Sequence, residues 1–159
     1  MYTFSPASFD DLPAAFALID RRVLWMQARN NHLWDFYREV YPDDYFRDLI
    51  RNGRLYLLKQ DGELAAMISL WDRDHRWTDS APALYLHNLA ADERFPGAGA
   101  EILRRCGERA IAEGRDRLRL DCSAKNPRLN AYYEEQGFAF AAACPGNIYY
   151  TPNLREKLL

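Results

Sequence analysis

The amino-acid sequence predicts a mixed α/β fold, in which helices flank a central sheet of parallel and antiparallel strands. Three observations lead to this prediction. Residues 84–122 contain a strand, a glycine-rich loop, a helix and a second strand, and a right-handed crossover makes such strands parallel. Asp61-Gly62 separates two apolar runs, as the turn of an antiparallel β-hairpin does. After Cys122, a helix and two strand-like runs continue the alternation that is typical of such folds.

The first third of the chain is predicted to form one strand and two helices. The strand is at residues 2–4, and Ser8 has a side chain that can cap the helix that follows. A second helix runs from Asp43 to about Asn52, because acidic residues favour its first turn and Gly53 can end it. The apolar stripe of the first helix, with a period near 3.6 residues, consists of Leu12, Phe16, Ile19 and Val23.

The remaining elements follow from apolar periodicity and from turn residues. The hairpin strands are at residues 55–60 and 64–71, and a polar segment at 72–80 leads to the central strand at 84–91. The next helix is predicted to end at Gly114, with an apolar stripe of Ile102, Leu103, Cys106, Ala110 and Ile111. The last predicted elements are a strand at 117–122, a helix from Asn126 and Pro127 through Gln136, and strands at 138–144 and 148–151.

Composition excludes several classes of protein. The 159 residues include 21 Lys and Arg against 23 Asp and Glu, so no basic excess points to nucleic acid or an anionic membrane. Cys106, Cys122 and Cys144 are odd in number and lack C-x-x-C spacing, which favours reduced thiols over a disulfide framework or a zinc site. No apolar run reaches about 18 residues, and the N-terminus lacks the pattern of a signal peptide. We therefore expect a cytoplasmic protein without a metal.

A glycine loop at residues 96–100 precedes the central helix. The free N–H groups at a helix N-terminus, together with the helix dipole, bind anions. Gly97 and Gly99 have no Cβ atom to keep a ligand from the backbone. Glycine loops also occur where no ligand binds. A nucleotide-binding α/β domain is disfavoured, because the chain has neither a complete G-x-G-x-x-G nor a G-x-x-x-x-G-K-[ST] motif.

Two motifs resemble those of the GNAT superfamily of acyl-CoA N-acyltransferases. Arg94-x-x-Gly97-x-Gly99 is similar to its pyrophosphate loop, Q/R-x-x-G-x-G/A. The stretch from Asn126 to Phe138 is similar to N-x-x-A-x-x-[LFY]-Y-x-x-x-G-F, with Leu129 in place of the alanine. The predicted order of elements also matches that family. The resemblance implies one GNAT-like domain over residues 1–159, whose parallel strands at 84–91 and 117–122 diverge at their C-terminal ends.

The resemblance also implies where acetyl-CoA, the co-substrate, binds. The pantetheine would enter the gap between the diverging strands, along the backbone of Leu89 and Ala91, and the glycine loop would hold the pyrophosphate. Asn126 would bond a ligand amide. The full set of expected acetyl-CoA contacts is Leu89, Ala90, Ala91, Arg94, Phe95, Pro96, Gly97, Ala98, Gly99, Ala100, Asn126 and Tyr133.

Acetyl transfer to an amine needs an acid and a base. Tyr133 lies two helical turns after Asn126 and therefore on the same face, and the resemblance implies that it donates to the leaving sulfur. A free alkyl amine has a pKa near 10, so about one molecule in 10³ is neutral at pH 7 and some group must take the proton. His87 and Asp121 are the candidate bases. A purely structural role is the alternative for all of these residues. His87 would be a strand histidine whose hydrogen bonds are made within the protein, and Asp121 would be an ion-pair partner. Asn126 would cap a helix, and Tyr133 would fill space in the core.

An aromatic run after the first helix is expected to form the acceptor wall, with Trp25 and Trp34 lining it. The leading hypothesis is an N-acetyltransferase that transfers an acetyl group to a primary amine of a small molecule or peptide by direct attack. The alternative is a non-catalytic acyl-CoA-binding or sensor domain that lacks an acceptor site. The expected partners are acetyl-CoA and an amine acceptor, without nucleic acid or membrane, in a monomer or homodimer.

Overall fold

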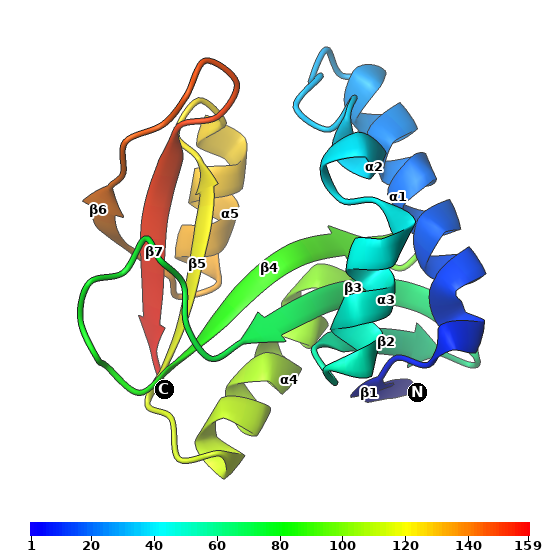
Figure 1. The fold of residues 1–159 in the computed structure, drawn as a ribbon, viewed down its shortest axis with the longest axis horizontal. Coiled ribbons are helices and arrows are strands. Elements are labelled where there is room, and N and C mark those ends of the chain that lie inside the picture. Colours follow the sequence, from blue (N-terminus) through cyan, green and yellow to red (C-terminus); the bar gives the residue numbers. More distant parts are fainter. The chain divides into compact units, whose positions relative to one another are not determined.

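The computed structural model describes residues 1–159 and has a mixed α/β architecture (Figure 1). Its strands are β1 (Tyr2–Pro6), β2 (Leu55–Gln60), β3 (Glu63–Trp71), β4 (Ala83–Ala91), β5 (Arg117–Ser123), β6 (Ala139–Ala143) and β7 (Pro152–Leu158). Its helices are α1 (Leu12–Gln27), α2 (Tyr37–Val40), α3 (Asp43–Arg51), α4 (Ala98–Ala112) and α5 (Pro127–Glu135), and the 3-10 turn η1 (Phe9–Asp11) precedes α1. No helix is long and apolar enough to cross a membrane.

The seven strands are hydrogen-bonded in the order β1-β2-β3-β4-β5-β7-β6. β4 and β5 are parallel, whereas β1–β2, β2–β3, β5–β7 and β6–β7 are antiparallel. The predicted mixed sheet is thereby confirmed. The residues group into two compact units: unit 1 is Met1–Ser69 with Asn88–Ile102, and unit 2 is Leu70–His87 with Leu103–Leu159. The division passes through β3, β4 and α4, so these three elements contribute to both units.

Unit 1 contains the predicted hairpin and the first helices. Asp61 and Gly62 both have positive φ angles, 52° and 88°, as the two central residues of a type I′ turn require. α1 and α3 pack against each other through Phe16 and Phe46, whose ring centroids are 5.6 Å apart. Ser8 begins the helical segment through a capping box with Asp11. Apolar side chains of these helices and of β2 and β3 form the core of this unit.

Unit 2 contains the parallel pair. The ladder between β4 and β5 consists of Ala83–Arg117, Leu84–Leu118 and Tyr85–Arg119, and it ends there although β5 continues to Ser123. β5 instead pairs with β7 along its whole length. This confirms the predicted parallel strands that separate toward their C-terminal ends. α5 packs on β5, and Leu118, Leu120 and Cys122 are buried as their alternation predicted.

The prediction of a last strand at residues 148–151 is wrong. Asn147 Oδ1 accepts hydrogen bonds from the N–H groups of Tyr149 and Tyr150, each 2.8 Å long, and this turn leaves Ile148 83% exposed. The last strand is instead β7. Its alternation of buried and exposed residues could not be recognised in the sequence, because it contains Arg155-Glu156-Lys157 and charged residues seldom lie in a core. Ile111 was predicted to be buried in the stripe of α4, but it is 60% exposed near the helix end.

Asn88 interrupts the regular conformation of β4. Its φ angle of 56° is in the left-handed region, which asparagine tolerates better than most residues. The side-chain Oδ1 accepts hydrogen bonds from Tyr45 and Ser69, both 2.7 Å long, and Nδ2 donates to the Tyr37 hydroxyl at 2.9 Å. The aromatic residues before and within α2 and α3 are thereby connected to β4 in unit 1.

Candidate active site

The glycine loop in unit 1 ends one turn earlier than predicted, because α4 begins at Ala98. Phe95 N–H donates to the Asp92 carbonyl at 3.1 Å, and Ala98 N–H donates to the Phe95 carbonyl at 3.1 Å. Gly97 has a φ angle of 85°, and its carbonyl accepts the first helical hydrogen bond, from Glu101 N–H at 3.0 Å. Gly99 and Ala100 therefore lie in the first turn of the helix and not in a loop.

This helix start has the features of an anion site. The backbone N–H groups of Gly97, Gly99 and Ala100 donate no hydrogen bond within the chain. A Cβ atom added at Gly97 would meet no atom within 4 Å, so the space in front of the backbone is open. Three free N–H groups and the positive end of the helix dipole suit a phosphate.

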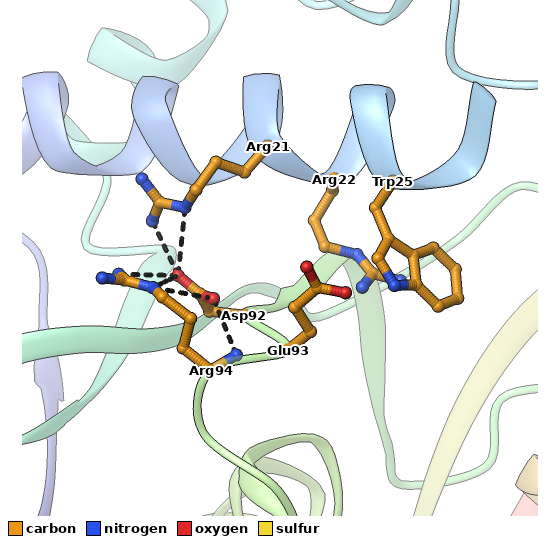
Figure 2. A pocket seen from close by; sticks show the side chains of 6 residues that line it. All are labelled: Arg21, Arg22, Trp25, Asp92, Glu93 and Arg94. Carbon is orange, nitrogen blue, oxygen red and sulfur yellow. Dashed lines mark hydrogen bonds and ion pairs between the residues drawn. The ribbon is translucent and has the colours of Figure 1, made fainter. Parts of the chain in front are cut away.

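Asp92 holds the chain just before this helix start (Figure 2). Its carboxylate accepts hydrogen bonds from Arg21 Nη2 at 2.7 Å, from Arg94 Nη2 at 2.9 Å and from Arg94 N–H at 3.0 Å. Burial raises the pKa of Asp92, but the hydrogen bonds from Arg94 and Arg21 outweigh burial and lower it to about 2. The Arg94 side chain is 53% exposed, so the same guanidinium also reaches solvent.

We expect Asp92→Asn to lower the free energy of unfolding by about 2–3 kcal/mol at pH 7. The pKa of Asp92 is lower in the folded protein than in the unfolded chain, where it is about 3.9. Its contribution is therefore complete above about pH 5 and is lost as pH falls toward 2. Urea unfolding at several pH values measures this. Asp48→Asn, which alters an exposed pair with Arg51, is the control with a change under about 0.5 kcal/mol; an equal loss in both variants would contradict the prediction.

Trp25 lines the same open pocket as Asp92, but Trp34 does not. The pocket is lined by Arg21, Arg22, Trp25, Asp92, Glu93 and Arg94 (Figure 2). The Arg22 and Arg29 guanidinium carbons lie over the Trp25 ring, 4.0 and 3.8 Å from its centroid. Trp34 instead packs against Tyr37, with ring centroids 4.4 Å apart and planes tilted by 33°. The structure thus brings Trp25 together with Arg94 of the glycine loop, and it places Trp34 in the aromatic cluster near Asn88.

Unit 2 carries Tyr133 and Asn126 on α5. Asn126 is the N-cap of the helix, and its Oδ1 accepts the Leu129 N–H at 3.0 Å, which confirms the structural reading for this oxygen. Tyr133 is buried, with its ring 5.5 Å from Tyr132 and 5.8 Å from Phe138. Burial, and to a smaller extent the nearby Cys122 and Asp121, raise the pKa of Tyr133. The phenol therefore keeps its proton at neutral pH.

His87 and Asp121 meet in a cluster in the same unit. His87 Nε2 is 2.9 Å from Asp74 Oδ2, and His87 Nδ1 is 3.8 Å from Asp121 Oδ1. Arg76 Nη1 lies 3.5 Å from Asp74 Oδ2 and 3.8 Å from Asp121 Oδ1, which confirms the ion-pair reading of Asp121. The Tyr150 hydroxyl donates to Asp121 Oδ2.

Sequence reasoning missed Asp74, Arg76 and Tyr150. The first two belong to a polar segment that reads as a solvated connection, and Tyr150 lies in the run mistaken for a strand. Burial raises the pKa of Asp74, but hydrogen bonds from His87 and from the Arg76 N–H outweigh it and lower the pKa to about 2. One signal in the sequence could have indicated these partners: His87 is in a central strand, and a half-buried histidine needs a polar partner.

A buried polar network fixes α5 against β7. Arg155 donates to Asn130 Oδ1 from Nε at 3.1 Å and from Nη2 at 2.9 Å, and its Nη1 donates to the Phe138 carbonyl at 3.1 Å. Asn130 Nδ2 donates to the carbonyls of Ser123 and Asn126, at 2.9 and 2.8 Å. Since Asn130 and Tyr133 are both on α5, this network sets where the tyrosine lies. Cys122 is buried and its Sγ is 3.3 Å from Asn130 Oδ1, as expected of a small core residue.

Comparisons with known proteins identify relatives of the chain. The model of the Acetyltransferase (GNAT) family matches residues 25–138. The uncharacterized N-acetyltransferase YesJ of Bacillus subtilis (strain 168) is 30% identical over 148 residues, which are 87% of this chain and 82% of YesJ.

Solved structures share the fold. An acetyltransferase of the GNAT family from Listeria monocytogenes 4b F2365 has a TM-score of 0.79 at 20% identity, covering 99% of this chain and 95% of that one. The PaiA N-acetyltransferase from Thermoplasma acidophilum, in complex with coenzyme A, has a TM-score of 0.76 at 16% identity, covering 100% and 99%.

Proposed function

The chain belongs to the GNAT family of acetyltransferases, and on this basis we propose that it acetylates a primary amine of a small molecule or peptide by direct attack on acetyl-CoA. Family membership makes the protein an N-acetyltransferase with acetyl-CoA as co-substrate. The observation that carries the finer proposal is that unit 2 holds both the buried Tyr133, whose raised pKa keeps it protonated, and the half-buried His87, whose ring nitrogens face Asp74 and Asp121. An acid and a base are what a direct transfer requires.

The glycine loop binds the pyrophosphate of acetyl-CoA in this proposal. The free N–H groups of Gly97, Gly99 and Ala100 donate to it, and the exposed part of Arg94 adds positive charge. The residues from Leu89 to Ala91 line the pantetheine with their backbone. Asn126 uses Oδ1 as a helix cap, which leaves its side-chain N–H groups for a ligand carbonyl. Phe95 and Pro96 are spacers in the loop, and Ala98 is the first residue of α4.

We expect Gly97→Val to weaken acetyl-CoA binding at least tenfold, or about 1.4 kcal/mol, because branched bulk fills the open space before the N–H groups. Gly114→Val is a matched control: both glycines have a left-handed φ, at 85° and 74°, and an added Cβ meets nothing within 4 Å at either. Both variants should lose similar stability, since valine is strained at such a φ, but only Gly97→Val should lose affinity. Calorimetric titration measures this, and equal affinities would remove the loop from the binding site. Gly99→Val should weaken binding in the same way.

Tyr133 and His87 have complementary roles in the transfer. A thiol has a pKa near 8.5 and a tyrosine one near 10, so Tyr133 first donates a hydrogen bond to the sulfur and protonates it late. The backbone N–H of Leu89 polarises the thioester carbonyl. His87 takes the proton of the amine, and Asp121 stabilises the positive charge that forms. The acceptor would contact Trp34 in the aromatic cluster near Asn88 and Trp25 in the open pocket, two different places in unit 1, through their aromatic faces.

Two measurements separate this proposal from the alternative, a domain that binds acyl-CoA without catalysis. Native mass spectrometry detects a bound CoA or acetyl-CoA by its mass. A thiol-release assay over a panel of small amines and peptide amines then detects turnover. Binding with turnover supports the enzyme, whereas binding without turnover on any amine favours the sensor. We further propose a single domain over residues 1–159, a monomer or homodimer, in the cytoplasm.

A further inference from the structure

We propose that the open pocket of unit 1 binds an oxyanion, a phosphate or carboxylate group, through the guanidinium of Arg22; only the identity of the molecule that carries this group rests on the proposed function. The pocket is lined by residues of α1 and of the turn that follows β4 (Figure 2). It holds about 270 Å³, part of which is open to solvent. Pockets for whole ligands usually hold about 300–1,000 Å³, so this pocket suits a single group of a larger molecule.

Arg22 is the arginine of this pocket whose hydrogen-bond donors are unused. A guanidinium has five N–H donors, and Arg22 forms no hydrogen bond and no ion pair within the chain. The residue is nonetheless half-buried. A charge that is partly withdrawn from water is costly unless an opposite charge or hydrogen-bond acceptors accompany it. An anion in the pocket would therefore be stabilised by Arg22.

Trp25 holds the guanidinium of Arg22 in place. The guanidinium carbon is 4.0 Å from the ring centroid, a cation–π contact. Arg29, just after the end of α1, lies over the same ring at 3.8 Å, and its Nη1 donates to the Trp25 carbonyl at 3.2 Å. A guanidinium that is fixed in this way can donate two parallel hydrogen bonds to the oxygens of a phosphate or carboxylate.

The other two arginines of the pocket already have carboxylate partners. Arg21 and Arg94 both donate to Asp92, at 2.7 and 2.9 Å. Arg94 Nη1 is also 3.6 Å from Glu63 Oε2. These two arginines therefore face two carboxylates, and their charges are balanced within the chain.

A positive excess remains around Arg22. Burial lowers the pKa of Arg22, the charge of Glu93 opposes this effect, and the charge of Arg29 adds to it. Both guanidinium groups keep their protons at neutral pH. Glu93 lines the pocket but forms an ion pair with neither arginine. Arg22 and Arg29 thus carry one positive charge more than the carboxylate beside them, as an oxyanion site requires.

Either substrate of the proposed reaction can bring such a group. Arg94 lines the pocket and also belongs to the glycine loop, so CoA held by its pyrophosphate at Gly97 can place its 3′-phosphate in the pocket. The amine acceptor can instead carry a carboxylate or phosphate, because Trp25 is a proposed contact of the acceptor. The two sources differ in which substrate a change at Arg22 affects.

Titration with inorganic phosphate tests the site without either substrate. In the full chain labelled with ¹⁵N-arginine, the Nε–H signal of Arg22, assigned by its loss in Arg22→Gln, should shift and reach saturation. Arg47 of α3 is the control, because it is exposed and does not line the pocket. An Arg22 signal that stays in place, or that moves only as the Arg47 signal does, would overturn the proposal.

Arg22→Gln then identifies the source of the group. If CoA carries it, wild type should bind acetyl-CoA at least about tenfold more tightly than acetyl-dephospho-CoA in calorimetric titration, and Arg22→Gln should remove that difference. If the acceptor carries it, Arg22→Gln should raise the KM for an amine with a carboxylate at least about tenfold, and should leave the KM values for the matching carboxamide and for acetyl-CoA unchanged. Arg47→Gln changes the net charge equally and should alter none of these values.

Glu93→Gln should have the opposite effect to Arg22→Gln and should tighten phosphate binding, because it removes the carboxylate that competes for Arg22. Weaker phosphate binding in Glu93→Gln, or an Arg22→Gln protein equal to wild type in both substrate comparisons, would overturn the oxyanion site. A wild-type protein that acetylates no amine would instead refute the proposed function. The phosphate titration and the comparison of acetyl-CoA with acetyl-dephospho-CoA would still decide whether Arg22 binds an oxyanion.

Discussion

Tyr133→Phe is expected to lower the kcat for acetyl transfer by about 10² to 10⁴, the usual effect of losing a positioned acid. The substitution removes one hydroxyl and little volume. The ring contacts with Tyr132 and Phe138 do not involve that hydroxyl, so the fold and the affinity for acetyl-CoA should survive. The defect should fall on kcat because negative charge develops on the sulfur only in the transition state.

Two comparisons make this test specific. The defect should shrink with an acyl donor whose thiol leaves more easily, since such a thiolate needs less protonation. Tyr132→Phe, one position along α5, should leave kcat near the wild-type value. Steady-state kinetics at saturating acceptor measure both variants. A Tyr133→Phe protein with wild-type kcat would refute the acid role and would favour a water molecule as acid or a sensor domain.

Arg155→Met is expected to lower the free energy of unfolding by about 3–5 kcal/mol, the usual cost of removing one partner from a buried charged network. Arg155 is 3% exposed, and it donates to Asn130 Oδ1 and to the Phe138 carbonyl. Methionine fills much of the volume but leaves these buried acceptors without their donor. Urea unfolding at pH 7 measures the difference.

Glu134→Gln is the matched control for Arg155→Met. It removes the charge of the one partner of Arg155 that is mostly exposed, so it should cost less than about 1 kcal/mol. Arg155→Lys keeps a charge but cannot reproduce the paired donors of the guanidinium, and its stability should be intermediate. An Arg155→Met protein within about 1 kcal/mol of wild type would show that the network orders α5 without stabilising it.

Local patterns predicted most of the fold. β2 has the predicted bounds, and the hairpin turn, the parallel pair and the helix starts near Asp43 and Pro127 are present. The glycines predicted to end helices at Gly53, Gly114 and Gly137 all have left-handed φ angles. Such features depend on residues close together in the chain, through periodicity and backbone sterics, so a single sequence contains them. The glycine loop before α4 and the position of Tyr133 on α5 could be predicted for the same reason.

The tertiary structure alone decided which charged residues are buried and which side chains accompany His87. Asp74 and Asp121 reach the two edges of its ring from different segments, and Arg119 meets Asp79 across a separation of 40 residues. β7 could not be predicted, because Arg155 enters the core only where Asn130, 25 residues earlier, offers an acceptor. A buried charge is stable only when partners distant in sequence satisfy it. Periodicity carries no record of those partners, so the glycine loop and the place of Tyr133 on α5 were predictable and the partners of His87 were not.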